Sequence, residues 1–130
     1  MTPEAVLITG ASGNLGRAVA AAFAARGANL ALLDRNRAHL DAAFGGESDR
    51  RMLIAADLLD AGEVEAAVAS VAARFGRIDA LANIAGGFRM GTPVHATSDA
   101  DWNFLFDLNA RTVLHAARAI HISQPALTKS

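Results

Sequence analysis

The stretch that decides the fold is TGASGNLG, residues 9–16, in which Gly10, Gly13 and Gly16 stand three positions apart. A short apolar run, residues 5–8, comes directly before it. An amphipathic helical pattern follows, with apolar residues at a spacing of four: Leu15, Val19 and Phe23. A strand, a glycine-rich turn and a helix in this order predict a loop whose backbone amides bind a phosphate group.

Each of the three glycines meets a different steric need. We expect Gly10 to let the strand turn tightly, Gly13 to let the backbone approach a pyrophosphate, and Gly16 to let the helix pack close to the sheet. The first helical amides and the helix dipole favour the negative charge of such a ligand. The alternative is an ordinary glycine-rich turn, against which the position between a strand and a helix argues.

Short apolar runs alternate with helical patterns along the rest of the chain. After residues 5–8, the apolar runs are residues 29–33, 52–56 and 78–82. A helical segment separates each run from the next, and glycines mark the turns. Strands that are apolar on both faces and alternate with helices predict an α/β fold. The expected architecture is a doubly wound parallel sheet of the Rossmann type, with helices on both faces.

The third and fourth helical patterns begin with capping signals. Asp60 and Glu63 stand as the N-cap and N3 residues of a capping box do. Ser98 and Asp101 can cap the last helix, which we expect to run to about Ser123. The apolar positions of this helix are Trp102, Leu105, Phe106, Val113 and Ile120.

An acidic residue ends the second predicted strand. Asp34 comes 18 residues after Gly16, where a carboxylate can accept hydrogen bonds from both hydroxyls of an adenosine ribose and repels a 2′-phosphate. This favours NAD as the cofactor. Arg35 follows directly and could neutralise a phosphate, so NADP remains possible. The alternatives are a solvated turn residue for Asp34 and a surface charge for Arg35.

With these motifs the sequence resembles the short-chain dehydrogenase/reductase family, whose usual glycine motif is TGxxxGxG. Asn14 stands where that motif has its middle glycine, a spacing more like that of extended and atypical members. The resemblance runs from Val6 to about Ala119 and implies the cofactor-binding half of the family fold, about four parallel strands in the order 3-2-1-4. It implies a dinucleotide on the glycine loop, at Gly10, Ser12, Gly13, Asn14, Leu15 and Gly16.

The resemblance also assigns the residues after the third and fourth strands. Asp57 and Leu58 would line the adenine ring, the carboxylate accepting from the exocyclic amine; a turn-forming Asp57 is the alternative. Residues 83–86, NIAG, resemble the family's NNAG. Their backbone would pass near the ribose and nicotinamide, between strands one and four. The cofactor-binding residues of this segment are Asn83, Ala85 and Gly86.

One polar residue interrupts the last helical pattern. Asn109 lies seven residues after Trp102, a spacing that places both on one helical face, so that the amide would point into apolar packing. In the resembled family an Asn in such DLNAR-like segments helps to organise a water and the catalytic lysine, which implies a catalytic role for Asn109. The alternative is a structural Asn that hydrogen-bonds the backbone.

The residues that would complete the chemistry are missing. In the family, hydride transfer needs a Ser on the next strand and a Tyr-x-x-x-Lys on the next helix. The chain has no Tyr, and its only Lys is Lys129. The resemblance thus implies an NAD(P)-dependent oxidoreductase that interconverts alcohols and carbonyls, inactive as this truncated chain. A non-catalytic dinucleotide-binding or sensing module and a structural partner chain remain alternatives. We expect residues 1–123 to form an incomplete dinucleotide-binding domain and residues 124–130 a disordered or non-native tail.

Composition excludes several other classes. With 12 basic and 13 acidic residues the chain offers no electrostatic surface for nucleic acid or an anionic membrane. It has no Cys, and its four histidines show no metal-ligand spacing, so no metal site is expected. The absence of a signal segment or a membrane-length apolar stretch predicts a cytoplasmic protein. Because strand four would be an open edge and the last helix would lose part of its cover, we expect self-association.

Overall fold

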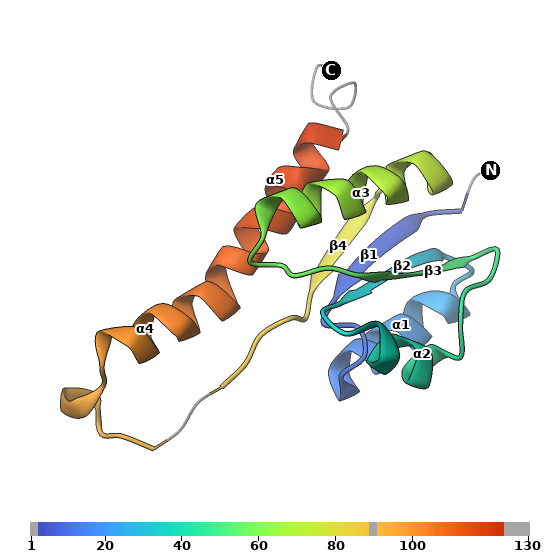
Figure 1. The fold of residues 1–130 in the computed structure, drawn as a ribbon. Coiled ribbons are helices and arrows are strands. Elements are labelled where there is room, and N and C mark those ends of the chain that lie inside the picture. Colours follow the sequence, from blue (N-terminus) through green and yellow to red (C-terminus); the bar gives the residue numbers. More distant parts are fainter. Residues whose placement is uncertain (1–2, 89–90, 124–130) are drawn as a thin grey trace.

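The computed structural model, which describes residues 3–88 and 91–123, contains a parallel sheet flanked by helices (Figure 1). In this part of the chain the sheet has four strands in the order β3-β2-β1-β4. The strands are β1 (Ala5–Thr9), β2 (Asn29–Asp34), β3 (Arg51–Ala55) and β4 (Ala80–Asn83). The predicted α/β fold and the strand order 3-2-1-4 are confirmed.

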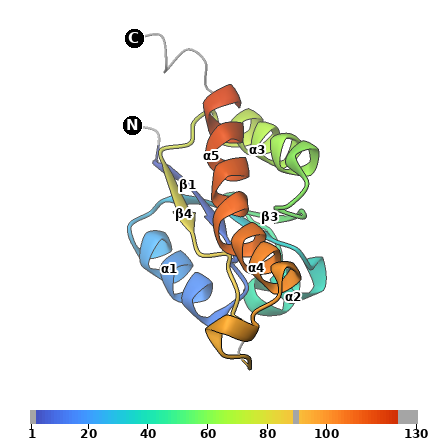
Figure 2. The ribbon, with the colours of Figure 1, turned by 90° about the vertical axis from the view of Figure 1, so that its left-hand side faces the viewer.

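Helices cover both faces of this sheet. The helices are α1 (Asn14–Ala25), α2 (Arg37–Phe44), α3 (Ala61–Phe75), α4 (Asp99–Phe106) and α5 (Thr112–Ser123). A first core cluster joins α3 and α5 to one face, and a second joins α1 and α2 to the other. Figure 2 shows α5 beside α3, with α1 across the sheet from them. The predicted doubly wound arrangement is therefore correct.

The strands differ in how deeply they are buried. Every residue of β1 is buried, because neighbouring side chains alternate between the two cores: Leu7 packs toward α3 and α5, and Val6 and Ile8 toward α1 and α2. In β4, three residues are half-buried and Asn83 is exposed. Within the described residues β4 pairs with β1 alone, so it forms an edge of the sheet.

The start of β4 is fastened to the start of β1. The Ala5 amide donates to Asp79 Oδ2 at 2.7 Å, and the Asp79 amide donates to the Ala5 carbonyl at 2.8 Å. The Arg77 guanidinium hydrogen-bonds the same carboxylate and, together with the Ala5 amide, lowers the pKa of Asp79 below its ordinary value. These contacts set the register that aligns the carboxyl ends of β1 and β4.

The capping signals are borne out with one change. The side chains of Asp60 and Ser98 accept from the amides of Glu63 and Asp101, both at 3.1 Å. The Glu63 carboxylate, however, accepts from the Asp57 amide at 3.3 Å and not from the Asp60 amide. The Asp60 amide is already used, because it donates to the Asp57 carbonyl in the turn before α3. Glu63 therefore binds the amide of Asp57, three residues before the N-cap, instead of the amide of the N-cap itself.

The last helical pattern is not one continuous helix. A π-helical turn, Asp107–Arg111, separates α4 from α5. Trp102 and Phe106 are 59% and 53% exposed, whereas α5 buries a narrower set of smaller residues: Thr112, His115, Ala116 and Ala119. Ala119 belongs to the core cluster that α5 shares with α3, and small side chains allow this close approach. In the first helix, likewise, Gly16 and Ala20 are the buried residues, and Leu15 is 64% exposed.

Two further expectations concern the chain as a whole. The tail expected at residues 124–130 lies outside the described residues. In the described part of the chain no helix combines the length and the apolar character needed to cross a membrane.

Candidate cofactor-binding site

A cavity of about 600 Å³ opens at the carboxyl ends of the strands. It lies where the order of the sheet reverses between β1 and β4, the position at which doubly wound sheets bind ligands. The glycine loop, the end of β2, the loops after β3 and β4, and the helical segment that contains the π-turn all contribute to its wall. All of the expected cofactor-binding residues line this cavity except Asn83.

Six residues line the cavity that the sequence did not identify: His39, Ala56, Leu59, Ile84, Leu108 and Thr112. Most of them lie within one position or one helical turn of a residue that the sequence motifs identified. Including these neighbours in the predicted site would have identified them. His39 gives no such signal. It reaches the cavity because Asn36 caps α2, accepting from the His39 amide at 3.2 Å, and so sets the direction of the first turn.

The glycine loop is shaped by two steric needs within the protein itself. Gly10 has φ +64°, and a Cβ there would lie 2.6 Å from the Ala85 amide nitrogen. A Cβ on Gly16 would overlap the carbonyl oxygen of Gly10. The loop, the first turn of α1 and the loop after β4 therefore pack together only because these two positions have no side chain.

Gly13 is different, because a side chain there would extend into the cavity and not into the protein. The nearest atom to a Cβ at Gly13 would be the Gly10 carbonyl oxygen at an ordinary 3.6 Å, and Gly13 lines the cavity. Gly13 is also the N-cap of α1, so it carries no side chain that could occupy the first amides of the helix. The result is a cradle with backbone donors that a phosphate group would fit.

The Asp34 carboxylate is fixed at both oxygens. Oδ2 accepts from the Ser12 hydroxyl at 2.5 Å and from the Ser12 amide at 3.1 Å, and Oδ1 accepts from the Arg35 amide at 2.7 Å. Ser12, expected only as a loop residue, thus joins the glycine loop to the end of β2. Because each carboxylate oxygen has more than one acceptor site, Asp34 keeps capacity for hydroxyl donors in the cavity.

The loop after β3 forms the next part of the wall. Asp57 Oδ1 accepts from the Leu59 amide at 3.0 Å, the contact of a turn-forming side chain. Asp57 and Leu58 also line the cavity. Asp57 therefore makes the contact expected of a turn-forming residue, and it also lines the cavity, as a residue that contacts adenine would have to.

The loop after β4 is held by β1 and by the π-turn. The Ala85 amide donates to Thr9 Oγ1 at 3.3 Å. Asn109 Oδ1 accepts from the Gly87 amide, and Asn109 Nδ2 donates to the Gly87 carbonyl, both at 3.0 Å. A Cβ on Gly86 would lie 2.6 Å from Asn109 Oδ1, so the loop can approach the π-turn only with glycine there.

The expectation that Asn109 points into apolar packing is wrong. Its side chain is exposed, and Nδ2 donates also to the Leu105 carbonyl at 2.9 Å. The π-turn changes the helical register, so the seven-residue spacing from Trp102 no longer places the two side chains on one face. The backbone contacts of Asn109 are those that the structural alternative requires.

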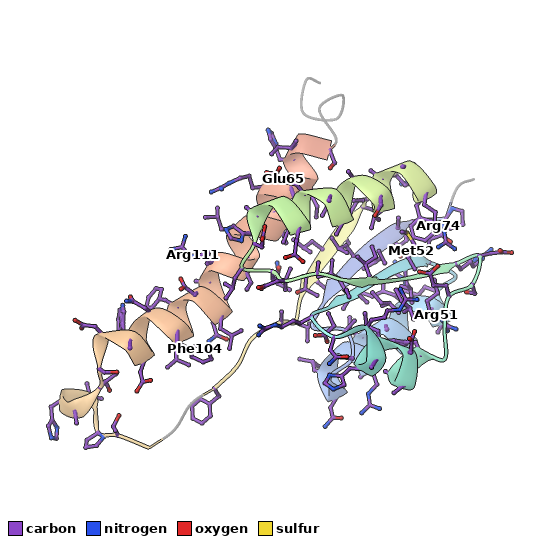
Figure 3. All side chains as sticks on the ribbon, in the orientation of Figure 1. Arg51, Met52, Glu65, Arg74, Phe104 and Arg111 are labelled. Carbon is purple, nitrogen blue, oxygen red and sulfur yellow. The ribbon has the colours of Figure 1, made fainter. Side chains whose placement is uncertain are left out.

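Charged and aromatic side chains beyond the cavity lie mostly on the surface. α4 extends away from the sheet, and Phe104 and Arg111 stand on this extended segment (Figures 1 and 3). Arg111 pairs with Asp107 at 2.8 Å within the π-turn. Across residues 3–88 and 91–123, no three His, Asp or Glu side chains gather closely enough to hold a metal ion.

Comparison with known proteins gives consistent results. Residues 4–123 match the family described as short chain dehydrogenase. D-threitol dehydrogenase of Mycolicibacterium smegmatis is 39% identical over 109 residues, which are 82% of this chain and 42% of that protein.

Two solved structures from Brucella melitensis resemble the fold. A short-chain dehydrogenase/reductase named glucose/ribitol dehydrogenase has a TM-score of 0.83 and 36% identity, over 92% of this chain and 51% of that one. A 3-ketoacyl-(acyl-carrier-protein) reductase complexed with NADH has a TM-score of 0.81 and 26% identity, over 96% of this chain and 53% of that one. The chain thus spans about half the length, or less, of these relatives.

Proposed function

The chain belongs to the short chain dehydrogenase family, and from this premise we propose that it is the dinucleotide-binding half of an NAD-dependent oxidoreductase. The observation that carries the proposal is that one cavity collects the glycine loop, Asp34 and the loops after β3 and β4 at the switch point of the sheet. The complex of a similar reductase with NADH supports a nicotinamide dinucleotide as the ligand. Calorimetric titration with NAD tests the proposal.

We assign the residues that line the cavity to separate parts of this cofactor. The amides of the first turn of α1, which no side chain caps, would hold the pyrophosphate, and Asp34 would accept from the adenosine ribose. Asp57 and Leu58 would line the adenine, and the backbone of Ala85 and Gly86 the nicotinamide side. We propose NAD as the preferred cofactor, because a 2′-phosphate would meet the Asp34 carboxylate; NADP is the alternative through the neighbouring Arg35.

The proposed reaction is the interconversion of an alcohol and a carbonyl. Bound NAD supplies the hydride acceptor for this chemistry. Asn109 would act from the π-turn, by holding the Gly87 backbone beside the nicotinamide end. A proton donor of the family's Tyr-x-x-x-Lys type does not occur among the 130 residues. We therefore propose residues 1–123 as a cofactor domain whose acid–base residues lie outside this sequence.

Substitution of Gly13 separates ligand binding from folding. We expect Gly13→Ala to keep the melting temperature within a few degrees, because its Cβ meets the protein at an ordinary distance. The affinity for ADP-ribose, measured by calorimetry, should fall on the order of tenfold because the methyl group occupies the phosphate cradle.

Gly16→Ala is the matched control for this prediction. Its Cβ would overlap the Gly10 carbonyl, so it should destabilise the fold by roughly 1–3 kcal/mol of overpacking. Loss of stability in Gly13→Ala, or an unchanged affinity for ADP-ribose, would contradict the assignment of the cradle.

Self-association is the partner interaction that we propose. Trp102 and Phe106 are exposed and in ring contact, with centroids 4.7 Å apart. Within residues 3–88 and 91–123, β4 is an edge of the sheet. Size exclusion with light scattering should show a dimer or larger species at tens of micromolar, because an open strand edge and an exposed apolar patch both favour contact with a second chain.

The double variant Trp102→Glu, Phe106→Glu should shift the equilibrium toward monomer. Phe88→Glu, at a residue 82% exposed in the loop after β4, is the control. A stable wild-type monomer would refute the proposal.

A further inference from the structure

His115 is a buried titratable side chain that the proposed site leaves unused. It lies in α5 and is 8% exposed, whereas the other three histidines are exposed. Its Nδ1 lies 2.7 Å from the carbonyl oxygen of Leu58, a residue 57 positions away in the chain. Because a carbonyl oxygen only accepts hydrogen bonds, Nδ1 must carry the proton, and the ring donates to Leu58.

The carbonyl that His115 holds belongs to the loop that lines the expected adenine end of the cavity. The loop also makes two local hydrogen bonds: Glu63 accepts from the Asp57 amide, and Asp57 accepts from the Leu59 amide. At its start, the Ala56 amide donates to the Asp34 carbonyl at 3.0 Å, which ties the loop to the end of β2. The His115 bond connects the loop to α5, an element on the far side of the π-turn in the chain.

We propose that His115 is a positioning residue for adenine recognition: by binding the Leu58 carbonyl it fixes Asp57 and Leu58 against the cavity. The inference deepens the proposed function and rests on it. It gives the helical segment that follows α4 two separate tasks. Asn109 holds the Gly87 backbone at one end of the cavity, and His115, six residues later, holds Leu58 at the other.

The test compares two dinucleotides that differ only at the adenine. One is NAD, and the other is its hypoxanthine analogue, which has a carbonyl in place of the exocyclic amine. If Asp57 accepts from that amine, wild type should bind NAD more tightly. In His115→Leu, which fills the site but cannot donate, the affinity for NAD should fall roughly fivefold to tenfold, the size of one lost hydrogen bond. The preference for NAD over the analogue should shrink by the same factor.

Two further variants make the comparison specific. His115→Asn keeps a donor at nearly the position of Nδ1 and should restore most of the preference for NAD. His121→Leu removes an exposed histidine of the same helix and should leave both affinities unchanged. Hydrogen exchange without ligand gives an independent measure. The Leu59 amide, which donates to Asp57, should exchange faster in His115→Leu than in wild type and His121→Leu.

The outcomes separate the inference from the proposed function. If wild type binds NAD and His115→Leu keeps the full preference over the analogue, the inference is wrong and the proposed function stands. An equal loss for both dinucleotides together with a lower melting temperature would show a merely structural histidine and would also overturn it. If wild type binds neither dinucleotide, the proposed function fails, and the inference that rests on it fails too.

Discussion

A polypeptide of these 130 residues is expected to bind NAD and to form no NADH with secondary alcohols, steroids or sugars, nor to consume NADH with 3-ketoacyl thioesters. The cofactor residues and the acid–base residues are different groups in the proposed mechanism, and only the first set is present. General acid–base catalysis contributes roughly 100- to 10,000-fold to a rate, and the chain has no Tyr to supply it. The measurement is NADH absorbance at neutral and alkaline pH.

His115 and His95 are two side chains that could in principle replace the missing proton donor, and their positions argue against both. His115 is buried, and its Nδ1 proton is engaged by the Leu58 carbonyl. His95 is exposed in the short 3₁₀ turn Val94–Ala96, which precedes α4. Turnover above the buffer blank that disappears in Asp34→Ala or Asn109→Ala would show that this polypeptide carries its own acid–base chemistry.

Asp34→Ala should give the largest change in cofactor affinity. We expect the affinity for NAD to fall by roughly 10- to 150-fold, equivalent to about 1.5–3 kcal/mol for hydrogen bonds to a charged group. The substitution also frees three donors that now point at the carboxylate: the Ser12 hydroxyl and the amides of Ser12 and Arg35. NADP should therefore lose less affinity than NAD, because its 2′-phosphate can accept from these donors.

The control for this prediction is Glu65→Ala, at an exposed acidic residue. Glu65 lies on α3 (Figure 3) and is not part of the cavity wall. It changes the net charge by the same amount as Asp34→Ala, so a general electrostatic effect would appear in both variants. Equal losses for NAD and NADP in Asp34→Ala, or a loss of similar size in Glu65→Ala, would contradict the role given to Asp34.

The main features of the fold were predictable because they follow from local patterns. The buried strand β1 is apolar at every position except the last, Thr9. The capping residues Asp60 and Ser98 mark helix starts because each bonds an amide only three residues later in the sequence. Most of the cavity wall was predictable for a related reason. In a parallel sheet, residues that directly follow strands meet at one edge, so Asp34, Asp57 and Ala85 converge wherever the strand order places them.

The remaining features depend on partners that are distant in the sequence. The helical pattern at residues 98–123 contains no sign of a π-turn; the turn places Asn109 against Gly87, 22 residues earlier. The bond between Ser12 and Asp34 also spans 22 residues and depends on the pairing of β1 with β2. The contact of His115 could not be predicted from the sequence, because its partner is a backbone carbonyl, which every residue type has. Such contacts can be identified only once the elements are placed in space.

The most direct test of the account is calorimetric titration of the wild-type chain with NAD and with ADP-ribose. The glycine cradle, Asp34 and the loop after β3 all serve the ADP-ribose part of the ligand. The account therefore predicts saturable one-to-one binding of both ligands, with ADP-ribose within a few-fold of NAD. No heat from either ligand at millimolar concentration would contradict it, and the cavity would then have to be assigned to something other than a dinucleotide.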